Sequence, residues 1–267
     1  MNRGPSRFIL PGVVVLLFGF LLAPIFIVVA AAFNAGEYLT FPPQGFSLRW
    51  FENFLSSRPF MRAFTFSLQL AFWVTMLATV IGTLAALFVV RFSRRAKDLL
   101  RVLFIAPLAF PSILTGIALL IYFYAIGVGT RGGMALFVGH VLVCVPYVFI
   151  SVSAVLVRFD SSLEEASRSL GAGPFTTFRR VTLPLIKGGV VAGAILSFIT
   201  SFDQFPVSLL LTGVGTTTLP IQLFDYLRFS FDPTAAAAST VSVGITVLAV
   251  TLTAWFVGLG SLYGDRS

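Results

Sequence analysis

One acidic side chain, Asp203, lies inside an apolar run of the sequence, SFITSFDQFPVSLLLTG. An ionised carboxylate that faced lipid would cost several kcal/mol, so Asp203 must face the interior of a helix bundle or a water-filled cavity. Pro206 follows three residues later and frees backbone groups that water in such a cavity could solvate. The chemistry open to Asp203 is reversible binding of a cation along a pathway. The alternative is a buried polar link between helices.

His140 and Cys144 are the single histidine and the single cysteine of the chain, and both lie in one apolar run. No cysteine, aspartate or second histidine stands at metal-ligand spacing from His140. We expect His140 to hydrogen bond to a neighbouring helix, with a substrate contact as the alternative, and Cys144 to pack in the interior. The sequence has no glycine-lysine-serine/threonine motif for phosphate. We therefore expect no catalytic, cofactor-binding or metal-binding residue in this chain.

The most polar internal segment, residues 158–188, predicts two short helices joined by a turn. Ser161 followed by Glu164 is a capping-box start. Gly171 can end the first helix because glycine takes the left-handed conformation at little cost. Pro174 suits the first turn of the second helix, and Pro184 is expected to end it. The apolar stripe of this segment has no core of its own, which predicts burial in a partner's groove; its residues are Leu163, Ala166, Leu170 and Phe175.

Composition places the chain in a membrane. Hydrophobic residues make up 57% and charged residues 10% of the sequence, and the mean hydropathy is +0.98. These values exceed those of soluble globular proteins. The formal net charge of +8 would suit nucleic acid, but the basic residues cluster in alternate loops, as membrane topology requires. We expect lipid around the chain and no nucleic-acid partner. The first apolar run is longer than a signal-peptide core, so we expect it to be retained.

Six apolar runs are long enough to cross a bilayer of about 30 Å, which takes about 20 residues. They lie near Phe8–Phe33, Phe64–Val90, Val102–Ile126, Met134–Val157, Gly189–Thr212 and Ala235–Tyr263. Of the 18 Lys and Arg residues, 13 fall in the termini and in alternate loops, among them Arg3, Arg94, Arg95 and Arg266. This asymmetry places both termini and the 158–188 loop on the cytoplasmic side.

Three local patterns add detail. Pro107 and Pro111 predict kinks that either line a cavity or serve packing between neighbouring helices. Small residues at helical spacing, Gly189, Gly193 and Ser197, predict close helix contact. Aromatic residues of the first outer loop predict an interfacial helix whose rings anchor it in the membrane surface, with a substrate contact as the alternative; they are Trp50, Phe51, Phe54 and Phe60.

The 158–188 loop resembles the EAA loop of binding-protein-dependent ABC importer permeases. The pattern is Glu-Ala-small, three residues, Gly, nine residues, an aliphatic residue, any residue and Leu-Pro; all spacings match, with Ser167 in place of the usual second alanine. In that family the loop is the coupling helix that docks into the ATP-binding subunit. An ordinary loop between membrane helices would need neither the spacing nor the cap. The resemblance implies coupling roles for Glu164, Glu165, Ala166, Ser167, Leu170, Gly171, Phe175, Val181, Leu183 and Pro184.

From about Leu48 onward, blocks such as TTTLPIQLFDYLRFSFDPTAAAAST resemble permeases of the spermidine/putrescine type, in the PotC-like subfamily. The resemblance implies an all-α integral membrane protein of the type I ABC importer permease fold, with six transmembrane helices in one domain over residues 1–267, in a bacterial inner membrane. It also implies a second permease subunit, either PotB-like or a second copy. Two cytoplasmic ATP-binding subunits would carry ATP and Mg, and a periplasmic or lipid-anchored protein would deliver the solute.

Two departures from the polyamine pattern bear on the solute. Where polyamine permeases often carry paired acids, this chain has Asp203-Gln204 and Pro111-Ser112, and a multiply charged cation gains from several carboxylates. Related importers carry aminobutyrate-like compounds, opines, aminophosphonates or ferric iron. The resemblance thus implies a small nitrogenous solute, a polyamine or a related amine or amino compound. The residues expected along its path offer a carboxylate, an amide, a hydroxyl and ring faces; they are Asp203, Gln204, Phe202, Phe205, Ser112 and Tyr122.

Two other classes of membrane protein compete with an importer subunit. A secondary transporter or channel should show more acids within the membrane and repeat-related broken helices. A membrane-embedded enzyme should show a convergent constellation of reactive side chains. The sequence shows one intramembrane acid, no evident repeat and no such constellation, and neither class explains the EAA spacing.

Overall fold

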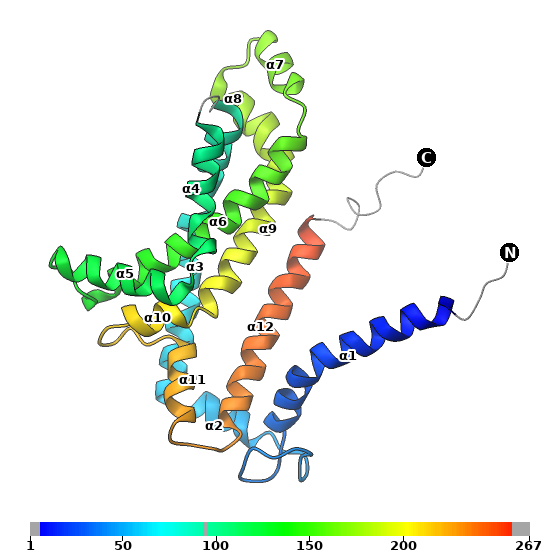
Figure 1. Cartoon of the computed structure of the whole chain (residues 1–267), viewed down its shortest axis with the longest axis vertical. Helices are drawn as coiled ribbons and strands as arrows, with labels where there is room; N and C mark the ends of the chain where they lie inside the picture. The colour runs from blue at the N-terminus through cyan, green and yellow to red at the C-terminus, as the bar shows by residue number, and fades with distance from the viewer. Residues whose placement is uncertain (1–5, 93–95, 258–267) are drawn as a thin grey trace. The chain divides into compact units, whose positions relative to one another are not determined.

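Helices account for nearly all of the described chain, which in the computed structural model comprises residues 6–92 and 96–257 (Figure 1). The longer helices are α1 (Ser6–Ala32), α3 (Arg58–Leu87), α4 (Lys97–Ala109), α5 (Ser112–Ala125), α6 (Met134–Arg158), α9 (Leu183–Phe202) and α12 (Thr234–Val257). The shorter ones are α2 (Arg49–Ser56), α7 (Ser162–Ser169), α8 (Pro174–Thr177), α10 (Pro206–Leu211) and α11 (Leu219–Leu227). Two π-helical turns, η1 (Phe88–Phe92) and η3 (Phe178–Thr182), and one 3-10 turn, η2 (Arg131–Gly133), complete the set.

Five helical stretches are each long and apolar enough to cross a membrane, and α4 with α5 forms a sixth, broken candidate. The five are Leu10–Ala32, Arg58–Arg91, Arg131–Arg158, Pro174–Phe202 and Thr234–Leu252. Four of them coincide with predicted apolar runs, so the all-α, multi-pass architecture is confirmed. The predicted bounds of the fifth run, Gly189–Thr212, are wrong, because the span is Pro174–Phe202 and the helix ends before Asp203. The predicted end of the sixth run at Tyr263, and the basic residues Arg3, Arg94, Arg95 and Arg266, lie outside the described residues.

The third predicted run is bent by 100° between α4 and α5. Phe110 is extended (φ −89°, ψ 141°), as expected for a residue before proline, and Pro111 has no N–H with which to continue the helix. Pro107, by contrast, lies inside α4. Of the two predicted kinks, the sharp one is therefore at Pro111, and the run is not one straight span.

The described chain divides into two compact units. The first comprises the chain up to Met61 together with Leu223–Ile245. Its core packs alanines of α1 and α12 around Trp50 of α2, whose indole Nε1 donates to the Asn34 carbonyl over 2.7 Å. Phe54 is fully buried and packs edge-on against Phe60. The prediction that Trp50, Phe54 and Phe60 are membrane anchors is wrong, because these rings fill the interior of the unit and are withdrawn from its surface.

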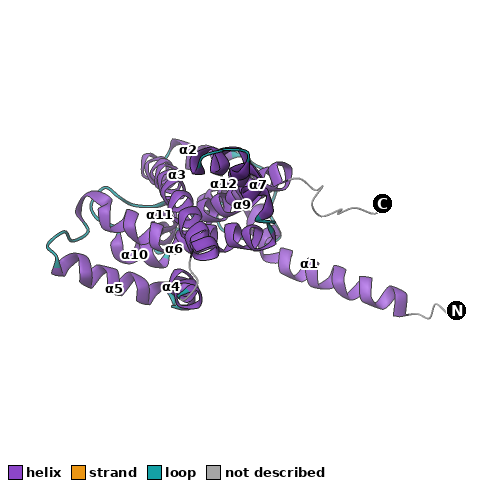
Figure 2. Cartoon of the chain, turned by 90° about the horizontal axis from the view of Figure 1, so that it is seen from above, coloured by secondary structure: helices purple, strands orange, loops and turns teal. Residues whose placement is uncertain are grey.

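The second unit comprises Arg62–Gln222 and the chain from Thr246, and α6 and α9 lie side by side at its centre (Figures 1 and 2). A Cβ added to Gly189 would lie 2.8 Å from the Ser151 carbonyl oxygen, and one added to Gly193 would lie 2.7 Å from the Val148 Cα. Only glycine allows backbones to come this close. The predicted close contact at Gly189 and Gly193 is confirmed. Cys144 is buried at the same interface, as expected.

Helices α5 and α10 of the second unit lie next to each other and run crosswise to α6 and α9 (Figure 1). A Cβ on Gly116 would approach both the Pro206 carbonyl and the Leu210 side chain, whereas one on Gly213 would meet the Thr130 carbonyl. The start of α10 therefore faces the first half of α5, and the chain after α10 faces the residues that follow α5. This arrangement brings the Asp203 segment toward the amino end of α5.

Candidate functional site

The 158–188 loop begins with a helix cap that differs from the prediction. Ser161 has helical dihedrals (φ −65°, ψ −17°) and its side chain makes no capping bond. The Ser162 N–H instead donates to Asp160 Oδ1 over 2.9 Å, and this bond lowers the pKa of the Asp160 carboxyl below its usual value. The capping box of Ser161 and Glu164 is therefore wrong, because the acid before Ser161 takes the capping role.

The first helix of the loop, α7, ends as predicted. Gly171 has φ +82°, in the left-handed region that favours glycine. The Gly171 N–H donates to the Arg168 carbonyl over 2.9 Å, and the Ala172 N–H donates to the Ser167 carbonyl over 3.1 Å. This pair of bonds is a Schellman motif, which satisfies the last carbonyls of α7 and turns the chain toward α8.

The second helix of the loop starts as predicted but does not end as predicted. Pro174 occupies the first turn of α8. The helical path then continues through the π turn η3 into α9, so Pro174–Phe202 is one stretch, and Pro184 lies in the first turn of α9. The expected stop at Pro184 is wrong. The wider π turn directly before this proline shifts the backbone bonding pattern, so its missing N–H no longer interrupts a regular ladder.

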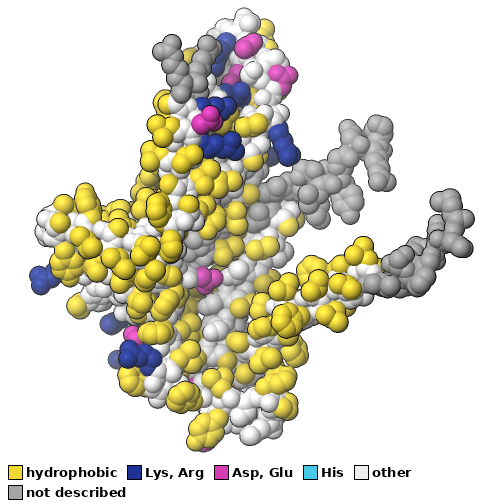
Figure 3. Space-filling view, viewed as in Figure 1, with side chains coloured by type: hydrophobic (Ala, Val, Ile, Leu, Met, Phe, Trp, Pro, Cys, Tyr) yellow, Lys and Arg dark blue, Asp and Glu magenta, His cyan; other side chains and the backbone are white. Residues whose placement is uncertain are grey.

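The apolar stripe of the loop lies at the surface. Leu163 is 48% exposed, Leu170 89% and Phe175 74%, and Glu165 and Ala166 are also exposed. A hydrogen bond of 3.1 Å between the Ser167 and Thr177 hydroxyls joins α7 to α8. Val181 is half-buried, whereas Leu183 and Pro184 are exposed. Most of these residues thus lie at the surface of the loop in the chain alone, and Figure 3 shows charged side chains gathered over the same end of the second unit.

Glu164 does not belong to that surface. Its carboxylate turns inward and accepts a hydrogen bond from the Thr182 hydroxyl over 2.7 Å. Arg91, at the end of the α3 span, lies 3.6 Å from the same oxygen. Sequence reasoning missed Arg91 and Thr182, since no local spacing links residues so far apart in the chain.

Asp203 lies at the break between α9 and α10. Phe202 ends α9, Asp203 follows as its cap, and α10 begins at Pro206. The Asp203 side chain is exposed and Gln204 is buried. No described Lys or Arg forms an ion pair with Asp203. The carboxylate has Thr246 of α12 as a hydrogen-bond partner within the second unit, and its amide neighbour is enclosed.

The other predicted pathway residues are distributed around this break. Phe202 is buried and stacks on Phe198, so its ring serves the core. Phe205 and Ser112 are half-buried, and Ser112 lies one turn before Gly116, on the side of α5 nearer to Asp203. Tyr122 lies about 15 Å further along α5 and is 56% exposed. The structure therefore brings Ser112 toward the break but leaves Tyr122 at the far half of α5.

His140 joins the helices on both sides of the break. Its Nδ1 lies 3.0 Å from the Ser201 hydroxyl and its Nε2 lies 2.9 Å from the Ser208 hydroxyl. The Ser208 hydroxyl donates its one hydrogen to the Gln204 carbonyl over 2.6 Å. Nε2 must therefore carry the imidazole proton, and Nδ1 accepts from Ser201. The expectation of an interhelical hydrogen bond is confirmed.

We expect His140→Leu to destabilise the second unit by about 1–3 kcal/mol, because the buried Ser201 hydroxyl loses its acceptor. Thermal unfolding of the detergent-solubilised protein measures this loss. Adding Ser201→Ala to His140→Leu removes the unpaired hydroxyl, so the double variant should lose less than the sum of the single variants. Additive losses would contradict a shared network.

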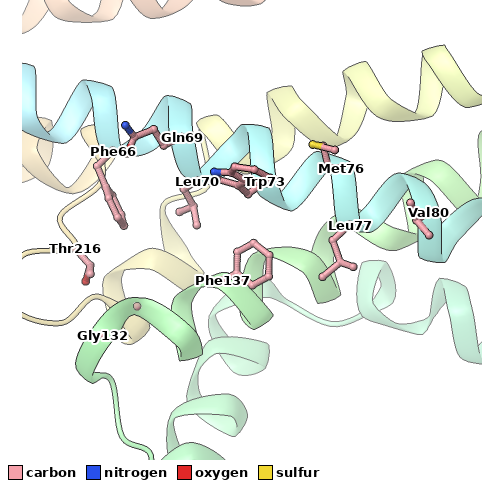
Figure 4. A pocket seen from close by; sticks show the side chains of 11 residues that line it. Phe66, Gln69, Leu70, Trp73, Met76, Leu77, Val80, Gly132, Phe137 and Thr216 are labelled. Carbon is pink, nitrogen blue, oxygen red and sulfur yellow. The ribbon is translucent and has the colours of Figure 1, made fainter.

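A groove of about 650 Å³ lies on another face of the second unit (Figure 4). Phe66, Trp73 and Leu77 of α3 form one wall, and Phe137 of α6 lies opposite them. Gln69 and Thr216 are its polar side chains. None of the predicted pathway residues lines it, so this groove and the Asp203 break are separate features.

Two polyamine transport permeases are similar in sequence to this chain over more than nine-tenths of its length. The chain is 34% identical to the putrescine transport system permease protein PotI of Escherichia coli K12, over 96% of this chain and 91% of that protein. It is 32% identical to the spermidine/putrescine permease protein PotC of Haemophilus influenzae, over 92% of this chain and 96% of that protein.

Solved structures show the same fold at lower identity. A bacterial ABC transporter that imports alginate matches with a TM-score of 0.70 at 14% identity, over 97% of this chain and 96% of that chain. The MetNI methionine ABC transporter matches with a TM-score of 0.60 at 23% identity, over 75% of this chain and 97% of that chain. Residues 78–259, which include the 158–188 loop and the Asp203 break, match the family described as binding-protein-dependent transport system inner membrane component. The chain belongs to that family and is a multi-pass membrane permease subunit of an ABC importer.

Proposed function

We propose that this subunit forms half of a translocation path for a small solute that carries a cationic nitrogen. The observation that carries the proposal is the exposed Asp203 carboxylate at a helix break, without an ion pair to any described Lys or Arg. A carboxylate in this situation is stabilised by a passing cation. The putrescine and spermidine/putrescine systems to which the similar permeases belong support an amine as the solute.

Uptake of labelled putrescine and spermidine, in cells that express this chain with its associated subunits, tests the proposal. We expect saturable uptake that depends on this chain and on ATP. An excess of unlabelled amines should compete, whereas neutral solutes of similar size should not. If neutral analogues inhibited uptake as strongly as amines do, the Asp203 charge would have no role in selecting the solute.

A second candidate is an aminophosphonate, which carries one amine and an anionic group. Asp203 is followed by the amide Gln204, whereas a second acid at that position would favour polyamines. This difference supports a solute with fewer positive charges. A putative 2-aminoethylphosphonate permease protein of Salmonella paratyphi A is 30% identical over 77% of this chain. Strong competition by 2-aminoethylphosphonate and weak competition by spermidine would favour this candidate.

The proposal includes partners that this chain requires for transport. A second permease, PotB-like or a second copy, would complete the path, and a periplasmic or lipid-anchored binding protein would deliver the solute. Two cytoplasmic subunits would bind ATP and Mg and carry out hydrolysis. The exposed stripe of Leu163, Leu170 and Phe175 is the surface we assign to the ATP-binding subunit, since its apolar side chains are uncovered in the chain alone.

The orientation follows from the distribution of positive charge, with the 158–188 loop inside the cell. In a Cys144→Ala background, a cysteine at the exposed Thr176 of α8 should be protected from an impermeant thiol reagent added to intact cells. A cysteine at the exposed Ser56 of α2 should react. Permeabilised cells, in which both positions should react, are the control. Labelling at Thr176 in intact cells would reverse the topology.

A further inference from the structure

Two adjacent acids of α7 face opposite directions. Glu165 is exposed on the surface assigned to the ATP-binding subunit, whereas Glu164 is buried, with 8% of its surface accessible. A buried carboxylate is stable only with partners that compensate its lost hydration. The partners of Glu164 therefore show what this residue holds together.

The partners come from two other segments. The Thr182 hydroxyl donates to Glu164 Oε1 over 2.7 Å, and Arg91 Nη2 lies 3.6 Å from the same oxygen. The Arg91 guanidinium also lies over the Phe159 ring, 4.7 Å from its centre, which favours a fixed position for the charge. One carboxylate oxygen thus links α7 to the ends of two membrane-spanning stretches.

Both partners belong to π-helical turns. Arg91 lies in η1, which follows α3, and Thr182 closes η3, which leads into α9. π turns leave the regular backbone ladder and are frequent at functional positions. The span that starts at Pro174 and passes through η3 ends at Phe202, next to Asp203. A movement of α7 that is passed to Thr182 therefore reaches the helix that carries the proposed solute contact.

The Arg91 contact is longer than a hydrogen bond. At 3.6 Å the two groups attract as charges, but N–H···O bonds are usually 2.7–3.2 Å long. Arg91 Nε and Nη2 are buried and have no hydrogen-bond partner among the described residues. A small displacement of α7 toward η1 would convert this ion pair into a hydrogen-bonded pair.

We propose that Glu164 is a positioning residue for coupling, and that its carboxylate is the joint through which movement of α7 reaches α3 and α9. The joint rests on the proposed function, in which α7 moves with an ATP-binding subunit. Glu165 and the apolar stripe meet the partner, and Glu164 transmits the movement inward through Thr182 and Arg91.

Variants of Thr182 test the joint with the least disturbance, in the assembled complex with its ATP-binding subunits and binding protein. Thr182→Val keeps the shape and removes the hydroxyl, and Thr182→Ser keeps the hydroxyl. We expect Thr182→Val to lower the amount of solute transported per ATP hydrolysed roughly tenfold, because a hydrogen bond to a charged group is lost. Thr182→Ser should restore most of the coupling. Thr176→Val, at an exposed threonine of the same loop, is the matched control and should match the parent.

A second measurement does not depend on the identity of the solute. Spin labels at the exposed Arg168 of α7 and Lys187 of α9 report the distance between the two helices in the assembled complex. We expect one narrow distance distribution in the parent and a broad one in Thr182→Val and Glu164→Leu. Unchanged distributions in both variants, or a parental transport-to-ATP ratio in Thr182→Val, would overturn the joint. If the parent took up no amine but showed a narrow distribution that both variants broadened, only the proposed function would be rejected.

Discussion

Gly171→Val should uncouple ATP hydrolysis from transport while the chain still inserts and assembles. Gly171 has φ +82° and nothing lies within 4 Å of an added Cβ, so the effect comes from backbone conformation and not from a clash. A β-branched residue in this region costs about 1–2 kcal/mol, which corresponds to a factor of about 5–30 in population. The Schellman turn would open, and α8 would be re-aimed relative to α7. Transport and the stimulation of ATPase activity by the binding protein should fall together.

Gly173 provides a matched control two residues away. Its backbone is extended (φ −68°, ψ 164°), which valine before a proline adopts readily, and its added Cβ also meets no atom within 4 Å. Gly173→Val should therefore remain coupled, and Gly171→Asn should be intermediate because asparagine tolerates the left-handed region. Equal behaviour of the two valine variants would show that the conformation of Gly171 is not what coupling requires.

Asp203→Asn should reduce uptake of a cationic solute without loss of assembled complex. The change keeps the size and hydrogen bonding of the side chain and removes its charge. A hydrogen bond to a charged group contributes about 1.5–3 kcal/mol, so apparent affinity should fall roughly ten- to hundredfold. Concentration-dependent uptake, together with basal ATPase activity and the yield of complex, separates a solute contact from a structural link.

Two variants complete this test. Asp203→Glu keeps the charge and should retain more uptake than Asp203→Asn. Asp225→Asn removes an exposed acid of α11 and should match the parent, which controls for a general loss of negative charge. Parental uptake by Asp203→Asn would take the residue out of the pathway, and a weakened complex would assign it to helix packing.

Features governed by neighbouring residues could be predicted from the sequence. The turn at Gly171 and the start of α8 at Pro174 follow from rules that involve a few adjacent residues. The spans follow from length and hydropathy. The residues assigned to the ATP-binding surface remain a prediction, although Leu163, Leu170 and Phe175 are exposed as such a surface requires.

The errors occurred where a competing neighbour or a distant contact decided the outcome. Asp160 displaced Ser161 as the cap because both can bond to the same N–H groups. Pro184 failed to end its helix because the π turn η3 precedes it, and no spacing rule anticipates such a turn. Glu164 points inward because of Arg91 and Thr182, which are remote in sequence. The residues along the solute path were harder to predict, because their positions depend on how α5 packs against α10. Tyr122, for example, lies away from the break.

The glycine contacts between α6 and α9 constrain how the permease can move. Backbones that touch at Gly189 and Gly193 have no intervening side chains to change rotamer, so sliding would drive the Val148 Cα and the Ser151 carbonyl into the opposite helix. The two helices must therefore tilt together as one rigid unit. Breaks in helical hydrogen bonding at Phe110 and at Asp203 are places where such tilting can be absorbed, so the proposed solute contact at Asp203 would lie at a hinge.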